Sequence, residues 1–203
     1  MKTNLNTYLF FGFLLILFSS CENDDGTVTI DQCESSNSIY SFTYSGKNYE
    51  IIKVNKTWLE AAACAVERGG FLAEINDAAE NTALFNELTN NASVTKSKTT
   101  APDGGDASYV WIGGNDIATE SNWIWDGNND GIAIQFWQGT ASGTVIGELY
   151  NNWGNEPDDY GNGQDGLGLA LSEWPLGSGT LGNAGQWNDV SHTNKLYYVI
   201  EYN

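Results

Sequence analysis

Residues 152–165 read NWGNEPDDYGNGQD, and the same residue types return at Trp187-Asn188-Asp189. Carboxylates and side-chain amides crowd both segments, and long stretches of Gly, Asn and Asp surround them. Several carboxylates held together repel one another unless they are protonated or bridged by a cation. Calcium takes six to eight oxygen ligands and tolerates irregular loops. Ordinary solvated turns would explain the same composition without a metal, so the residues alone leave both explanations open.

Short apolar segments between the polar loops predict strands, because they are rich in aromatic and β-branched residues. In chain order they are residues 39–44, 49–54, 110–112, 123–125, 134–137, 167–171 and 197–202. Trp123 and Trp125 alternate as strand residues do, which predicts that both indoles belong to the core. The polar residues 92–107 are expected to form a loop.

Two helices are expected before most of the strands. Their predicted N-terminal capping boxes are Thr57 with Glu60 and Asp77 with Glu80. In such a box each side chain accepts a hydrogen bond from the other residue's backbone N–H. Gly69-Gly70 stops the first helix, and the second ends at Asn90-Asn91. Helices early and strands late predict an α+β fold.

The chain has 203 residues, 26 of them acidic and 8 basic, and a formal net charge of −18. Phosphate binding requires a basic face, so nucleic acid is excluded as an expected partner. Hydrophobic residues make up 41%, which is enough for one packed domain. His192 is the only histidine and no Cys-x-x-Cys pair occurs, so neither a zinc site nor histidine-based nucleophilic catalysis is expected.

Residues 1–20 are predicted to be a lipoprotein signal peptide. Lys2 precedes an apolar run over residues 8–18, which is too short to span a membrane as a helix. Small residues directly before Cys21 resemble the lipobox of bacterial lipoproteins, in which the cysteine is acylated. An ordinary cleaved signal peptide is the alternative.

Residues 21–37 are expected to be an acidic, flexible tether. The acidic residues just after Cys21 resemble the surface-export signal of lipoproteins in some Gram-negative bacteria. The expected location is therefore the bacterial outer membrane, with a lipid anchor as the only membrane attachment and the domain exposed at the cell surface. Cys33 and Cys64 either form a disulfide, or Cys64 is a buried small hydrophobic residue.

From residue 38 to 203 the sequence resembles the C-type lectin-like domain family. The matching pieces are Trp58, Ala61 and Cys64, then Gly70 to Ile75, Glu80-Asn81, Trp111-Ile112-Gly113, Trp123-x-Trp125, Asn152-Trp153, Glu156-Pro157-Asp158, Trp187-Asn188-Asp189 and Tyr198 to Tyr202. The resemblance implies an α+β fold with two helices, small antiparallel sheets and a long loop region that carries calcium. Residues 136–139 and 150–153 look like bacterial members in particular.

The resemblance also implies two calcium sites. The sugar-binding site would use Glu156, Asp158, Gln164, Asn188 and Asp189, with a cis bond before Pro157. An auxiliary site would use Asp116, Glu120, Asp159 and Asp165. The cysteine pairs typical of the family are not expected here, because Ile200, Gly166 and His192 stand where their partners would lie.

Two positions depart from the family pattern. The family usually has Glu where Gln164 stands, and Glu-Pro-Asn or Gln-Pro-Asp at residues 156–158. A sugar hydroxyl on calcium normally donates to a carboxylate and accepts from an amide NH₂. Glu156 and Asp158 only accept, so the expected donor is Asn188 or Gln164. The exposed sugar face would also meet the ring of Tyr160, unless that ring anchors the loop.

Calcium-dependent glycan binding by a lipid-anchored lectin domain is the function that the resemblance implies. The alternative is the same fold binding protein or another non-sugar ligand, with calcium purely structural. No enzymatic activity is expected, because every clustered acid is better assigned as a calcium ligand than as a glycosidase carboxylate.

Overall fold

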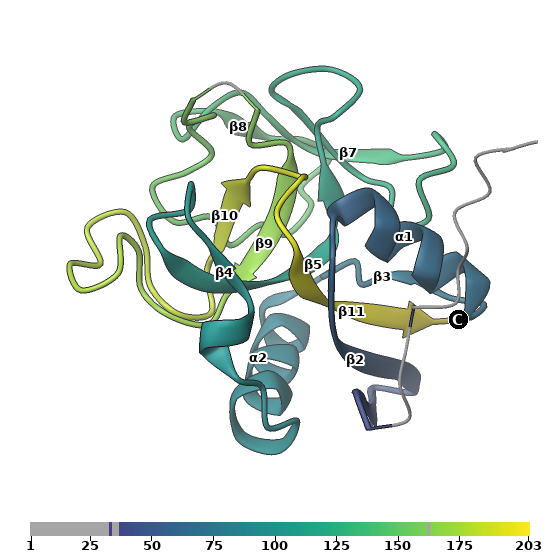
Figure 1. Ribbon diagram of the computed structural model, residues 1–203. Coiled ribbons are helices and arrows are strands. Elements are labelled where there is room, and N and C mark those ends of the chain that lie inside the picture. The colour runs from purple at the N-terminus through teal and green to yellow at the C-terminus, as the bar shows by residue number, and fades with distance from the viewer. Residues whose placement is uncertain (1–32, 34–36, 162) are drawn as a thin grey trace, which may run out of the picture.

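The computed structural model describes Cys33 and residues 37–161 and 163–203 (Figure 1). The predicted signal peptide, the acylation of Cys21 and most of the predicted tether lie outside these residues and stay predictions. Within the described part, no helix is both long and apolar enough to cross a membrane.

The two expected helices are α1 (Trp58–Glu67) and α2 (Ala78–Asn86). The capping box of α1 is confirmed. The Glu60 N–H donates to Thr57 Oγ1 at 3.3 Å, and the Thr57 N–H donates back to Glu60 Oε2 at 2.9 Å. A π-helical turn, η1 (Glu87–Asn91), continues α2 to the predicted end of the second helix.

The capping box predicted for α2 is only half formed. Asp77 Oδ1 accepts from the N–H groups of Ala79 and Glu80, both at 2.8 Å. The Glu80 side chain does not reach back to Asp77. Its Oε2 accepts from the Asn76 N–H at 2.6 Å, and its Oε1 accepts from the Tyr49 hydroxyl at 2.5 Å. The full-box prediction is wrong because the Asn76 N–H and the Tyr49 hydroxyl take this carboxylate.

Each apolar segment predicted to be a strand lies in one, except that Leu171 falls one residue beyond the end of its strand. The strands are β1 (Ile39–Tyr44), β2 (Lys47–Lys56), β3 (Phe71–Leu72), β4 (Thr100–Ala101), β5 (Ala107–Asn115), β6 (Asn122–Trp125), β7 (Ile134–Gln138), β8 (Thr144–Val145), β9 (Gly166–Ala170), β10 (Trp187–Val190) and β11 (Leu196–Tyr202). The predicted loop 92–107 instead contains a 3₁₀ turn, η2 (Lys96–Lys98), and β4. Thr99 explains the difference, because its buried hydroxyl donates to the Tyr109 carbonyl and ties this segment to β5.

The strands join into one sheet rather than into separate small sheets. Its main path runs β1-β2-β11-β5-β6-β7-β8, and β5 also pairs with β4 and β9. The pair β11–β5 is parallel, and the other pairs are antiparallel. The nine residues of β5 give it room for four partners, so this buried strand connects all parts of the fold.

The helices lie on opposite faces of β2 and β11 (Figure 1). Ile51 of β2 belongs to the hydrophobic cluster that includes α2, whereas its neighbour Ile52 packs with α1. In β11, likewise, Val199 belongs to the cluster that includes α2, and Tyr198 packs with α1. Successive side chains of a strand point to opposite faces, so a strand covered on both faces needs adjacent apolar residues, such as Ile51 and Ile52 in β2.

Indole and phenyl rings pack beneath the polar loops. The rings of Trp125 and Phe136 stack with their centroids 4.6 Å apart, and Trp187 meets Trp125 edge-on at 5.5 Å. Trp123 and Trp125 are buried, which confirms their predicted place in the core. Trp187 is the first residue of β10, so the packing of its ring fixes where that strand begins.

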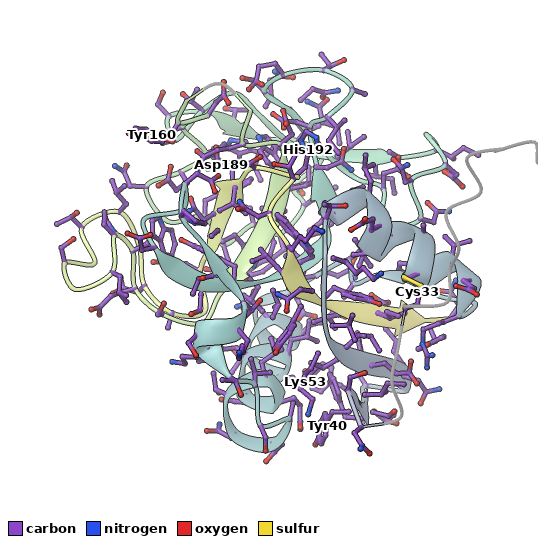
Figure 2. All side chains as sticks on the ribbon, in the orientation of Figure 1. Cys33, Tyr40, Lys53, Tyr160, Asp189 and His192 are labelled. Atoms are coloured by element: carbon purple, nitrogen blue, oxygen red, sulfur yellow. A yellow bond between two sulfur atoms is a disulfide. The ribbon has the colours of Figure 1, made fainter. Side chains whose placement is uncertain are left out.

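Cys33 and Cys64 form a disulfide, drawn in yellow beside α1 in Figure 2. Cys33 is only 5% exposed, and its carbonyl accepts from the Tyr198 hydroxyl at 3.0 Å. This residue of the predicted tether is therefore packed against the domain.

Candidate metal centre

Three strand ends bring the acidic loops together. β5 ends at Asn115, β9 begins at Gly166, and these two residues are paired across the sheet. β10 lies on the other side of β9 and pairs Val190 with Gly166. Asp116, Asp165 and Asp189 therefore come from three neighbouring strands at one edge. Figure 2 shows Asp189, His192 and Tyr160 together at this end of the molecule.

The primary cluster consists of Glu156, Asp158 and Asp189, each of which offers a carboxylate oxygen within 4.8 Å of the others. The peptide bond between Glu156 and Pro157 is cis, as the resemblance implied. Asp189 Oδ2 accepts from the N–H groups of Asp158 and Asp159 at 3.0 and 2.8 Å. β10 thus holds the loop around Asp158 through the side chain of Asp189, which belongs to the cluster.

Three buried oxygens of this region have no hydrogen-bond partner among the described residues: Glu156 Oε2, Asn188 Oδ1 and Asp189 Oδ1. Their residues are 3%, 2% and 0% exposed. A buried polar atom left unpaired costs about 1–3 kcal/mol, and more when it is charged. Oxygens of carboxylates and amides are the ligands that calcium takes. The residues present therefore fit the cation that the sequence resemblance implied.

The other two predicted ligands, Asp158 and Gln164, accept from the same backbone N–H. Asp158 Oδ1 and Gln164 Oε1 both accept from the Tyr160 N–H, at 3.0 and 2.7 Å. Each of these oxygens keeps a second lone pair for a metal. Asp158 is exposed, so the cluster opens to solvent on this side.

Burial changes the protonation of these carboxyl groups in the metal-free protein. Desolvation, opposed by the Trp174 N–H bond and supported by the charge of Asp158, raises the pKa of Glu156 to about 7. Desolvation also raises the pKa of Asp189 well above its usual range. A bound divalent cation would favour the charged form of both groups, because opposite charge lowers a carboxyl pKa.

The auxiliary cluster consists of Asp116, Glu120 and Asp165, again with oxygens within 4.8 Å of one another. Asp116 Oδ1 is buried and unpaired, while its Oδ2 accepts from the Ser121 N–H at 2.8 Å. Burial first, then the neighbouring negative charges, raise the pKa of Asp116 to about 8.

Asp159 is the predicted auxiliary ligand that stands outside this group. Its Oδ1 accepts from the N–H groups of Gly163 and Gln164, at 2.5 and 3.1 Å, and so closes its own loop. Asp165 has a contact that the sequence did not predict, because its Oδ2 lies 2.5 Å from His192 Nδ1. A histidine two residues beyond the end of β10 gives no local signal of that pairing.

A pocket of about 240 Å³ opens in front of the primary cluster. Its polar lining includes Glu156, Asp158, Gln164 and Asn188, and its apolar lining includes Trp174, Pro175 and Leu181. Tyr160 stands at the same pocket with 70% of its surface exposed, so its ring is available to a ligand and does not anchor the loop.

Sequence reasoning missed the residues that support the primary cluster. Trp174 Nε1 donates to Glu156 Oε1 at 3.0 Å, and Asn188 Nδ2 donates to the Tyr109 hydroxyl at 3.0 Å. Gln164 Nε2 donates to the carbonyl of Asp103 at 3.1 Å, and it lies 3.3 Å from the carboxylate of the same residue. These partners are 18 to 79 residues away in the chain, so no local motif reveals them.

Comparison with known proteins agrees with this architecture. A family model for the lectin C-type domain matches residues 54–201. No curated protein matches the chain.

Several solved structures share the fold. The carbohydrate-recognition domain of the mouse scavenger receptor C-type lectin is 19% identical, with a TM-score of 0.51, and the alignment covers 79% of this chain and 91% of that one. The C-type lectin CEL-I from Cucumaria echinata is 22% identical, with a TM-score of 0.52 and coverage of 79% and 93%. A Ca²⁺-dependent type II antifreeze protein in its Ca²⁺-free form is 18% identical, with a TM-score of 0.50 and coverage of 80% and 97%.

At these identities the structural likeness shows the fold alone, whereas the family model matches well over half of the sequence. C-type lectin-like domains are generally binding domains rather than enzymes, and many bind calcium. The matched residues contain both acidic clusters, all of α1 and α2, and the strands from β3 to β10. The chain belongs to the C-type lectin domain family.

Proposed function

We propose that this domain binds calcium at the primary cluster and binds a glycan through that calcium. The observation that carries the proposal is a set of three buried, unpaired oxygens: those of Glu156 and Asn188, which line the pocket, and that of Asp189, which lies with Glu156 in the primary cluster. Asp158 and Gln164 complete the set of five ligand residues. Calcium takes six to eight oxygens, so positions remain for ligand hydroxyls or water.

Calcium, when bound, supplies coordination positions for two neighbouring hydroxyls of a sugar. The protein must then accept the hydroxyl protons and donate to the remaining lone pairs. Asp158 is the exposed acceptor. Of the two expected donors, Gln164 already gives its NH₂ to Asp103, whereas Asn188 uses one N–H toward Tyr109 and has a second. Asn188 is therefore the donor in this proposal.

A single exposed site of this kind binds weakly, with a dissociation constant on the order of millimolar. Many copies on one surface would multiply that affinity without new contacts. The proposal therefore includes attachment through acylated Cys21 to the bacterial outer membrane, with the domain facing outward. Mutating Cys21→Ala should abolish labelling with a palmitate analogue, and unchanged labelling would rule out the anchor.

A glycan array probed in calcium and again in chelator tests the binding function. We expect signals that chelator removes and that Asp189→Ala abolishes in calcium. The exposed Glu67 on α1 provides the matched control, because Glu67→Ala also removes one carboxylate but leaves both clusters intact. Signals that persist in chelator would contradict a mechanism through calcium.

The alternative function is binding of a protein or another non-sugar ligand, with calcium purely structural. One observation favours it: Trp174 and Asp103 already occupy polar atoms of Glu156 and Gln164 that a sugar could otherwise use. An empty array together with a calcium-dependent melting temperature would select this alternative.

A further inference from the structure

Two buried aromatic side chains, Tyr109 and Trp174, hydrogen-bond to Asn188 and Glu156, two of the proposed calcium ligands. We propose that they are positioning residues: Tyr109 makes Asn188 turn its oxygen toward the cation, and Trp174 holds the carboxylate of Glu156 in place. The inference rests on the proposed calcium site and adds two residues to it that would not touch the metal.

The Tyr109 hydroxyl has a fixed direction. It lies 2.7 Å from the Gly104 carbonyl, which can only accept, so the single phenolic proton points there. The hydroxyl oxygen must then accept from its other neighbour, Asn188, at 3.0 Å. The NH₂ end of that amide therefore faces Tyr109, and Oδ1 faces away from it. This Oδ1 is one of the three unpaired oxygens.

Trp174 acts on Glu156 by holding its carboxylate in one place, because the two oxygens of a carboxylate are equivalent. An indole N–H can only donate, and this one donates to Oε1 at 3.0 Å, which leaves Oε2 as the unpaired oxygen. The indole has little freedom to move. A Cβ atom on Gly154 or Gly182 would come within 2.5 or 2.0 Å of its ring, so only glycine fits at either position.

The two rings also support each other. Tyr109 and Trp174 meet edge-on with their centroids 6.0 Å apart, and both are at most 1% exposed. Partners that orient a metal ligand typically contribute about ten- to a hundred-fold to metal affinity. Without the hydroxyl, the Asn188 amide can turn over and present its NH₂ group to the cation. The partial positive charge of that NH₂ group would repel the cation.

The test is the calcium affinity of Tyr109→Phe, measured by titration calorimetry with calcium chloride. We expect a dissociation constant about ten-fold higher than that of the parent. Tyr198→Phe is the matched control, because Tyr198 is also fully buried and its hydroxyl donates to a carbonyl remote from the cluster, that of Cys33. This control should bind calcium as the parent does.

Melting in chelator separates positioning from general stability. If Tyr109→Phe and Tyr198→Phe melt alike without calcium but differ in calcium affinity, the hydroxyl of Tyr109 acts on the metal site. Equal calcium affinities of Tyr109→Phe and the parent would overturn the inference and leave the proposed function standing. A parent protein that binds no calcium would instead overturn the proposed function itself.

A second comparison depends on the amide of Asn188. A carboxylate has two equivalent oxygens, so turning it over changes nothing at the cation. Removing the Tyr109 hydroxyl in an Asn188→Asp background should therefore affect calcium affinity less than it does in the parent. An equal loss in both backgrounds would show that the hydroxyl does not act through the amide.

Trp174→Phe removes the N–H donor to Glu156 and should also weaken calcium binding. Loss of the indole leaves a void between Gly154 and Gly182, so this variant is compared with the others only if it folds. Calcium affinity at the parent level in folded Trp174→Phe would remove Trp174 from the inference.

Discussion

Two of the regions that contain buried acidic groups differ in one respect, because the protein neutralises only one of them. The first region is the Lys47 cluster, made of Lys47, Tyr49, Glu80 and Glu201. Lys47 Nζ lies 2.6 Å from Glu201 Oε1 and 3.4 Å from Glu80 Oε1. All four oxygens of the two carboxylates have a partner, because Glu80 Oε2 accepts from the Asn76 N–H and Glu201 Oε2 accepts from the Glu74 N–H.

The primary cluster differs in having no cation of its own. Among the described residues no lysine or arginine is paired with Glu156, Asp158 or Asp189, and two of these carboxylates keep an unpaired oxygen. Both regions are buried in the same fold, so burial alone does not explain the difference. One region is complete as folded, whereas the other is the region at which we propose that a cation binds.

The largest expected effect is that of calcium on stability. A ligand that binds only the folded state at about 100 times its dissociation constant adds roughly 2.7 kcal/mol to the free energy of unfolding. For a domain of this size that raises the melting temperature by about 5 to 10 °C. Calorimetry in calcium and in chelator measures the shift. Identical melting in both conditions would mean that neither acidic cluster binds calcium.

Lys47→Met should be the next largest change. It leaves Glu80 and Glu201 buried without their cation, but Lys47 is 40% exposed, so water compensates in part. We expect a loss of about 2 kcal/mol, between the values for surface and buried ion pairs. Chemical denaturation should give the same loss with and without calcium. Lys98→Met, at an exposed lysine of η2, is the control and should be nearly neutral.

The pH dependence of stability should also distinguish the two states of the metal site. The pKa of Glu156 is raised to about 7 and that of Asp116 to about 8 in the calcium-free fold, against about 4 in the unfolded chain. Groups with a raised pKa stabilise the fold while protonated, and this contribution is lost as the pH rises from about 4 through about 8.

Melting temperatures in metal-free buffer should therefore fall between about pH 5 and pH 8. Saturating calcium should flatten that fall, and calcium affinity should increase over the same range because the protons must leave before the metal binds. A melting temperature in metal-free buffer that rises over this range would contradict the assignment of these carboxyls as desolvated and unpaired.

Of these changes, Asn188→Asp should alter the free energy of unfolding least. It should remove glycan binding while keeping calcium binding. The variant keeps an oxygen for calcium but replaces the NH₂ that donates to a sugar hydroxyl. We expect calcium binding without glycan binding, whereas Asp189→Ala should lose both. Calorimetry with calcium and binding to an immobilised glycan measure the two functions separately. If Asn188→Asp binds the glycan as the parent does, the proposed hydroxyl contact with Asn188 is wrong.

Much of the fold could be predicted because its signals are local. Alternation in segments such as residues 123–125 predicted strands, and the pair Thr57 and Glu60 predicted the start of α1. Glu80 shows the limit of such reasoning. Its spacing from Asp77 suits a capping box, yet the Tyr49 hydroxyl and Lys47 occupy its Oε1 and the Asn76 N–H occupies its Oε2.

The site could be predicted only in part, for the same reason. Family resemblance indicated the acidic residues in both clusters, because they sit in short motifs with fixed spacing. It could not indicate that Asp159 would close its own loop or that Trp174 would hold Glu156. The Trp174 contact depends on how the segment after β9 folds back over the cluster, and Gly182 carries no sign of the indole that packs on it.

The disulfide has a mechanical consequence. Cys33 precedes β1 in the chain, but its covalent partner Cys64 lies in α1. A pull on the residues before Cys33 is therefore transmitted through the sulfur atoms into that helix rather than along the backbone into β1. The β1–β2 hairpin does not carry the load and would not be unzipped from its free end. If the chain is held at Cys21, tension from a captured ligand reaches the anchor through α1 and one covalent bond.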